Sequence, residues 1–151
     1  MRVRIARVAK ESNEPSPTRL DSGWRELQEG RWAEARARFE QAASAEETPE
    51  ALEGLSWAAW WLDDGETVLT SRERAYRLYR RGKEPLGAAR MATWLAVDQL
   101  DFRGAAAVAQ GWLARAHRLL DPLEPGPEHG WLAFHDGFFC LLYTSPSPRD
   151  S

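Results

Sequence analysis

Three histidines and several carboxylates are the residues of this 151-residue chain that could bind a metal ion or move a proton. His129 and His135 stand beside carboxylates at Glu128 and Asp136, and His117 lies in a polar helical phrase. A zinc site needs three or four such ligands around one ion. The separation of His129 from His135 places them on different sides of a helix, because helical neighbours recur every three or four residues. We therefore expect neither a metal site nor a bound cofactor.

Asp63 and Asp64 form a pair of carboxylates directly before Gly65. Paired carboxylates can act as general acid and base, but aspartates before a glycine are typical of a turn, where they bind nearby backbone amides. The turn is the simpler interpretation. The chain also shows no glycine-rich phosphate loop and no nucleophile elbow. We expect no catalytic residue and no enzymatic activity.

Tryptophan is the unusual component, with eight in the chain. Trp57, Trp60 and Trp61 fall within one arc of a helix, a pattern that usually belongs to a core but could also face a partner. Trp94 and Asp98 share one face of a later helix. A carboxylate at the edge of an apolar stripe either pairs with an arginine or lines a groove, and pairing is the commoner case.

A run of arginines follows the tryptophan-rich segment. Its members, interrupted by one glutamate at Glu73, are Arg72, Arg74, Arg77, Arg80 and Arg81. Such a run is ordinarily a solvated helix face, and the alternative is a basic edge that contacts a partner.

The remaining composition is that of a globular chain, with 43% apolar and 28% charged residues and a net charge of −3. The mixed charges do not suggest nucleic-acid binding. A single cysteine fits a reducing compartment, and no apolar run reaches the length that crosses a bilayer. We expect a cytoplasmic protein with no membrane contact.

Hydrophobic residues recur at helical spacing throughout, which predicts an all-α fold of antiparallel hairpins. Thr48 before Pro49 is a typical helix start, and Gly30 and Gly82 are typical stops. The expected helices are 17–29, 32–46, 49–62, 67–81, 85–100, 104–120 and one that begins near 127.

Two of the turns repeat each other. Gly30, Ala35, Phe39 and Ala42 have the same spacing as Gly104, Ala109, Leu113 and Ala116. Glycine permits a tight turn, alanine permits close helix approach, and the larger residue fills the space between the helices. Phe39 and Leu113 should therefore be equivalent and buried. Counted from Gly65, the middle hairpin gives Thr70, Arg74 and Arg77, which predicts a repeat that is degenerate or locally longer.

These phrases resemble the tetratricopeptide repeat (TPR), whose period is about 34 residues. "EGRWAEARARFEQAAS" and "RGAAAVAQGWLARAHRLL" are each similar to the second half of one repeat. Whole phrases between 23 and 137 also resemble the N-terminal region of large actinobacterial transcriptional regulators of the LuxR type. That resemblance implies a non-catalytic regulatory module without its DNA-binding helix-turn-helix. An accessory domain of a signalling enzyme such as a nucleotide cyclase, or a free-standing TPR adaptor, is the alternative.

The first helices of TPR hairpins line a concave surface, so the resemblance implies a groove for a protein or peptide partner. The residues predicted to line it are Trp57, Trp61, Trp94 and Asp98.

The two ends of the chain differ from its middle. We expect residues 1–15 to be a frayed or disordered tail, 16–139 to form an incomplete TPR-like domain, and 140–151 to be non-native. The segment "CLLYTSPSPRD" resembles the translation of a sequencing adapter, which would leave Cys140 without a redox role. A Ser-Pro phosphorylation tail or a disordered terminus is the alternative.

The last helix carries Trp131, Phe134 and Phe138 on one face. Part of this face should cover the preceding helix near Trp112 and Leu119. The rest would remain uncovered, and residues after Thr144 should be unstructured. We expect such an uncovered aromatic face to cause non-native self-association.

Overall fold

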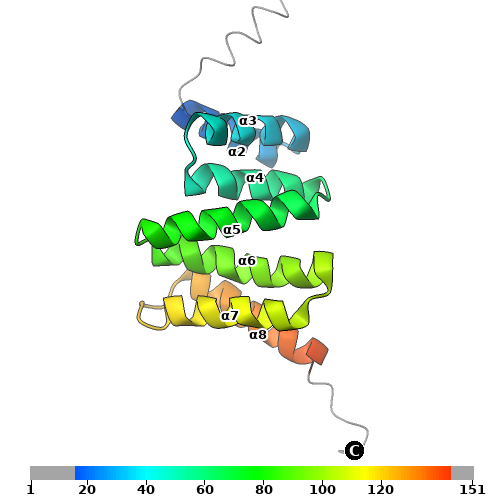
Figure 1. Cartoon of the computed structure of the whole chain (residues 1–151), viewed down its shortest axis with the longest axis vertical. Helices are drawn as coiled ribbons and strands as arrows, with labels where there is room; N and C mark the ends of the chain where they lie inside the picture. Colours follow the sequence, from blue (N-terminus) through cyan, green and yellow to red (C-terminus); the bar gives the residue numbers. More distant parts are fainter. Residues whose placement is uncertain (1–15, 144–151) are drawn as a thin grey trace, which may run out of the picture. The chain divides into compact units, whose positions relative to one another are not determined.

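The computed structural model describes residues 16–143, and all regular structure in that range is helical (Figure 1). Seven helices are present there and no strand, which confirms the all-α prediction. They are α2 (Ser16–Gln28), α3 (Trp32–Ala45), α4 (Pro49–Trp61), α5 (Gly65–Arg81), α6 (Pro85–Arg103), α7 (Ala106–Leu120) and α8 (Pro127–Tyr143). The predicted N-terminal tail and the residues predicted to be unstructured after Thr144 lie outside the described residues.

The chain divides into two compact units, Met1–Leu78 and Tyr79–Ser151, with the boundary inside α5. In the first unit α3 packs against both α2 and α4, and α2 also contacts α4. In the second, α6 and α7 form a hairpin and α8 packs against both. Within each unit, helices that follow one another in the chain lie side by side, as in the repeats of an α-solenoid.

Four of the turns have one residue in the left-handed conformation. These are Gly30 (φ 78°), Asp63 (57°), Lys83 (56°) and Gly104 (60°). At Gly30, Asp63 and Lys83, the amide of the left-handed residue donates to the carbonyl three residues earlier, at 3.1 to 3.2 Å. The next amide donates to the carbonyl five residues earlier, at 2.9 to 3.0 Å. This pair of bonds is the Schellman motif, which satisfies the last carbonyls of a helix.

The same core register follows each of these turns. Positions five, nine and twelve residues after the left-handed residue are buried in every case. The four sets are Ala35, Phe39 and Ala42; Val68, Arg72 and Ala75; Ala88, Ala92 and Leu95; and Ala109, Leu113 and Ala116. The predicted equivalence of Phe39 and Leu113 is therefore confirmed in burial and register.

The middle repeat is not degenerate in the way the sequence predicted. Its turn residue is Asp63, and Gly65 is the first residue of α5. The register therefore begins two residues earlier than a count from Gly65 would place it. As a result Arg72, and not Arg74, occupies the position of Phe39.

Phe39 shows why the small residues recur. A Cβ atom added at Gly23 of α2 would lie 2.8 Å from Cε1 of Phe39, and one at Gly54 of α4 would lie closer still. The Phe39 ring therefore lies against glycines of both neighbouring helices. Trp24 adds an edge-on contact, with 5.2 Å between ring centroids. The core of the first unit is built around this ring.

Helix α8 buries a different face from the one predicted. Its buried residues are Leu132, His135 and Phe139, each one position after Trp131, Phe134 and Phe138. The latter three are 53%, 63% and 48% exposed. A one-residue shift rotates a helix face by about 100°, so the prediction that the Trp131 face covers α7 was wrong.

The cap predicted at Thr48 is present, and Asp64 provides a second cap. Thr48 Oγ1 accepts a hydrogen bond from the amide of Ala51 at 3.2 Å and so caps α4. Asp64 caps α5, because its Oδ1 accepts from the amide of Thr67 at 3.1 Å. The turn interpretation of the Asp63–Asp64 pair is thereby supported.

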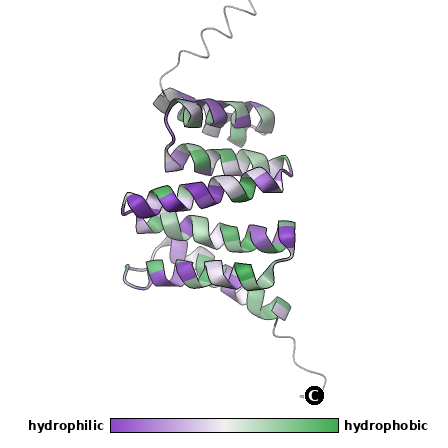
Figure 2. Cartoon of the chain, in the orientation of Figure 1, coloured by the Kyte–Doolittle hydropathy of each residue, from purple (hydrophilic) through white to green (hydrophobic). Residues whose placement is uncertain are grey.

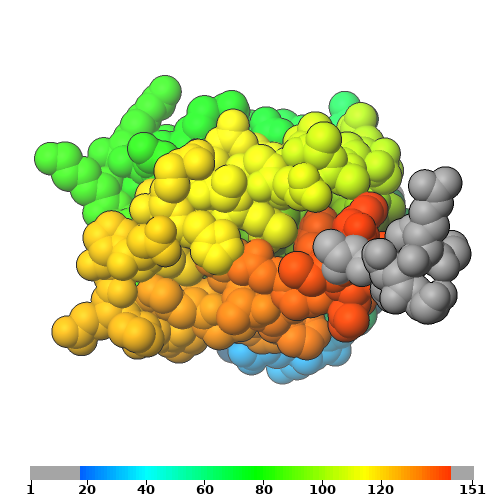
Figure 3. Space-filling model, turned by 90° about the horizontal axis from the view of Figure 1, so that it is seen from below, coloured from blue at the N-terminus to red at the C-terminus, as the bar shows by residue number. Residues whose placement is uncertain are grey.

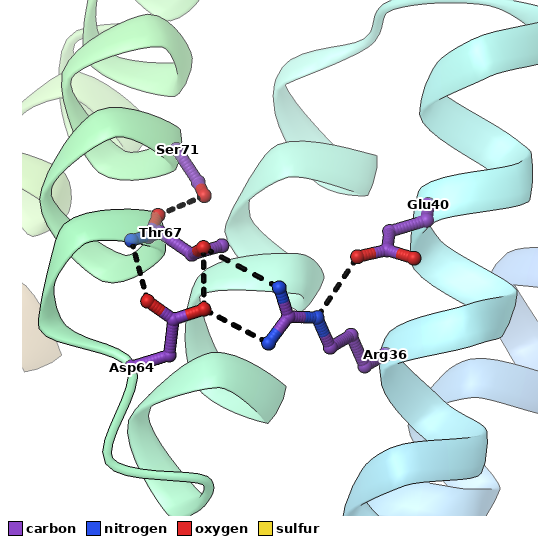
Figure 4. A network of polar contacts seen from close by, with 5 residues as sticks. All are labelled: Arg36, Glu40, Asp64, Thr67 and Ser71. Carbon is purple, nitrogen blue, oxygen red and sulfur yellow. Dashed lines mark hydrogen bonds and ion pairs between the residues drawn. The ribbon is translucent and has the colours of Figure 1, made fainter.

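Asp64 is also part of a polar network that links α3 to α5 (Figure 4). Arg36 Nη1 donates to Asp64 Oδ2 at 2.9 Å, and Thr67 Oγ1 donates to the same oxygen at 2.7 Å. Arg36 Nε donates to Glu40 at 2.8 Å. The bonds from Thr67, more than the Arg36 pair, lower the pKa of Asp64.

Replacing Asp64 with alanine should lower the free energy of unfolding by about 0.5–2 kcal/mol, the usual loss on removing a helix cap. A carboxyl whose folded pKa is lowered stabilises the fold above its unfolded pKa of about 3.9 and loses that effect as the pH falls further. Urea denaturation at about pH 7 and about pH 3 checks this. Wild-type protein should lose more stability between the two than Asp64→Asn, and equal losses would exclude the proposed role.

Lys83 offers a stabilising change, because a lysine in the left-handed conformation carries a steric cost that glycine avoids. Lys83→Gly should raise the free energy of unfolding by a few tenths to about 1 kcal/mol. Thermal denaturation followed by circular dichroism measures it. Arg81→Gly, inside the last turn of α5, is the matched control and should destabilise. A destabilising effect at both positions would contradict the left-handed turn at Lys83.

Candidate interaction surfaces

Four tryptophans form a cluster in the first unit, which we call the tryptophan cluster: Trp32, Trp57, Trp60 and Trp61. Trp61, the last residue of α4, stacks on Trp32, the first residue of α3, with 4.6 Å between ring centroids and 8° between planes. Trp60 meets Trp61 edge-on at 5.1 Å and Trp57 at 6.5 Å. The predicted grouping on α4 is present, with Trp32 added from α3.

The tryptophan cluster is exposed to solvent at Trp61 and more buried at Trp57. Trp61 is 52% exposed, so part of its indole is accessible from solvent. Trp57 is half-buried, and the guanidinium of Arg72 lies 4.5 Å from its ring centroid. One face of the Trp61 indole is covered by Trp32, and its exposed part can pack against an apolar or aromatic side chain of a partner.

The sequence predicted that Arg72 lies on a solvated helix face, or else on a basic edge that contacts a partner, and for Arg72 both were wrong. It is fully buried, although α5 is strongly hydrophilic in Figure 2. Its Nε donates to Ser56 Oγ at 3.1 Å, and Ser56 in turn donates to the carbonyl of Glu53 at 2.6 Å. Arg74 stays at the surface and pairs with Glu47. Arg72 follows the left-handed residue Asp63 at the same sequence spacing as Phe39 follows Gly30. That spacing would have identified Arg72 as a core residue.

The other two predicted groove residues lie in the second unit. Trp94 is half-buried, and its ring centroid lies 5.7 Å from that of Trp131 and 5.1 Å from that of His135. Asp98 has no exposed surface. A partner at the surface cannot reach its carboxylate, so the structure removes Asp98 from the predicted groove. Trp57 and Trp61 belong to the first unit, whereas Trp94 belongs to the second.

The histidines take separate structural places. His129 Nδ1 accepts from the amide of Gly126 at 3.1 Å, and its Nε2 lies 3.0 Å from the carbonyl of Leu120. These two bonds select the tautomer that carries a proton on Nε2. They tie the loop before α8 to the end of α7. His117 pairs with Asp136 at 2.7 Å.

His135 is buried between α8 and its neighbours, beside Trp94 and Trp131. Burial lowers its pKa, and the charges of Asp101 and Asp136 partly oppose that shift. The imidazole therefore favours its neutral form and serves as an aromatic core residue. The sequence indicated His135 only as a possible metal ligand and did not predict its place in the core.

Within residues 16–143, no three histidine, cysteine or acidic side chains lie close enough together to hold a metal ion. No helix in that range combines the length and apolarity needed to cross a bilayer. No protein-family model, no curated protein and no solved structure matches the chain. The features that bear on function are therefore the arrangement of the helices and their exposed side chains.

Proposed function

We propose that this chain is a non-catalytic, TPR-like interaction module that binds a protein or peptide partner through the tryptophan cluster. The observation that carries the proposal is the core register repeated after four turns. Asp63 follows Gly30 by 33 residues, close to the TPR period of about 34. The interval from Asp63 to Gly104 is longer than the one from Gly30 to Asp63, and it contains α6, which has 19 residues.

The tryptophan cluster is the favoured contact surface in the first unit for a physical reason. Tryptophan is enriched among the few residues that dominate binding energy at protein interfaces. Trp61 is held rigidly by Trp32 and Trp60, so binding would cost little side-chain entropy. Trp94 in the second unit is a weaker candidate because α8 covers part of it.

The parent protein that we propose is a cytoplasmic LuxR-type transcriptional regulator, with DNA contacted by a helix-turn-helix elsewhere in the protein. The net charge of −3 supports the absence of direct nucleic-acid binding by this chain. The gene sequence downstream of codon 139 tests the parentage. A helix-turn-helix supports it, whereas a cyclase or kinase signature would favour an accessory domain of a signalling enzyme.

A displayed peptide library selected against the chain tests the binding surface. We expect Trp61→Ala to weaken the selected peptides by at least about tenfold, the scale of an interface hot spot. Trp131→Ala, which removes an equally exposed tryptophan from the second unit, should leave their affinity unchanged. Equal losses in both variants, no loss in either, or no selected binder would each contradict the proposed surface.

A further inference from the structure

Helix α8 has a second apolar face, opposite the one it buries. Gly130, Phe134, Gly137 and Leu141 follow each other at intervals of four, three and four residues, which aligns them along one side of a helix. Phe134 is 63% and Leu141 80% exposed. Trp131 and Phe138, on the flank of this stripe, are about half exposed. A helix that is apolar on both sides is normally covered on both sides.

The two glycines are open in the same way. A Cβ atom at Gly130 or Gly137 would meet no other atom within 4 Å. In contrast, Gly23 in the first unit and Gly87 in the second each lie against an aromatic ring, of Phe39 and Tyr79 respectively. Glycine in a helix permits close approach of another group. Along the α8 stripe, the open spaces (holes) at Gly130 and Gly137 therefore alternate with the large exposed side chains of Phe134 and Leu141.

We propose that α8 binds α8 of a second copy of this chain, antiparallel across a two-fold axis. The stripe is self-complementary about the midpoint between His135 and Asp136. With the axis there, Phe134 of one copy faces Gly137 of the other, and Leu141 faces Gly130. Every large residue then meets a hole, and the match holds in both directions as a two-fold interface requires. A stripe that bound a helix of a different protein would not need to match itself in this way, so the symmetry favours a second copy of the chain as the partner.

The exposed apolar area fits a weak dimer. On the stripe and its flank, the large exposed side chains are Trp131, Phe134, Phe138 and Leu141. At the sizes typical of these side chains they present roughly 400–500 Å² per copy, against about 800 Å² per partner in a standard interface. Figure 3 shows α8 at the surface beside α7, and in Figure 2 the C-terminal end of α8 has the colour of hydrophobic residues. This inference concerns the chain with its Leu141, and it is independent of the proposed binding surface, which lies in the first unit.

Sedimentation equilibrium of the whole chain tests the dimer, with a reductant present so that the exposed Cys140 forms no disulfide. The 17.1 kDa chain should approach twice that mass as its concentration rises. Phe134→Gly leaves hole opposite hole, and Gly137→Phe places ring against ring. Each should raise the dimer dissociation constant at least about tenfold.

The double variant Phe134→Gly with Gly137→Phe should restore dimerisation, because it exchanges the large residue and the hole across the axis. Circular dichroism of each variant verifies that α8 and its neighbours remain folded. A chain that stays monomeric at all concentrations overturns the proposal. So do folded single variants that dimerise normally, or a folded double variant that is no better than the single ones, since both outcomes indicate another surface or another partner.

Discussion

Replacing Phe39 with alanine is expected to lower the free energy of unfolding by about 3–5 kcal/mol, the usual cost of emptying an aromatic core site. The ring fills the space between Gly23 and Gly54 and packs on Trp24. Neither glycine has a side chain that could move into the vacated volume. The cavity should therefore persist, and the loss should lie in the upper part of that range. Urea denaturation followed by circular dichroism measures it.

Leu113→Ala tests whether the same register supports the second unit, with an expected loss of about 2–5 kcal/mol. Leu86→Ala is its matched control, because Leu86 is 45% exposed, and it should change stability by no more than about 0.5 kcal/mol. Similar effects for Leu113→Ala and Leu86→Ala would contradict the equivalence of Leu113 with Phe39.

Arg72→Ala should destabilise the chain by about 2–5 kcal/mol, because Arg72 occupies the Phe39 position of its own repeat and leaves a comparable cavity. The substitution also removes the hydrogen bond to Ser56 and the guanidinium that lies over Trp57. Buried polar groups that lose a partner carry a further desolvation cost. Denaturation followed by tryptophan fluorescence is a suitable readout, since Trp57 contacts the altered residue.

Arg74→Ala is the control for this prediction. Arg74 lies two residues further along the same helix, and its ion pair with Glu47 is at the surface. Exposed ion pairs contribute about 0–1 kcal/mol, so this variant should remain close to the parent chain. A larger loss at Arg74 than at Arg72 would reverse the register assigned to α5.

The sequence predicted the parts of the fold that depend on local chemistry. Thr48 before Pro49 starts a helix because a hydroxyl and a proline each suit one specific position. Gly30 and Gly104 mark turns because glycine adopts the left-handed conformation at little cost. Asp63 and Lys83 take the same conformation, and no residue preference would have identified Lys83. There the hydrogen bonds and the packing that follow the turn outweigh the local cost.

The errors at the candidate sites have a common cause, which is that burial depends on position in the repeat as well as on residue type. Arg72 was interpreted as a surface residue and His135 was considered only as a metal ligand, yet both fill core positions. Asp98 was left open between pairing and groove, and its burial excludes surface contact. The grouping of Trp57 with Trp61 was predictable from helical spacing, whereas the stacking of Trp32 on Trp61 required the pairing of α3 with α4.

Backbone φ angles from nuclear magnetic resonance couplings and chemical shifts test the repeated register most directly. The register predicts positive φ at Asp63 and Lys83, as at Gly30 and Gly104, with Gly65 already helical. A positive φ at Gly65 together with a helical Asp63 would contradict it. The core of α5 would then begin two residues later, and Arg72 would no longer be equivalent to Phe39.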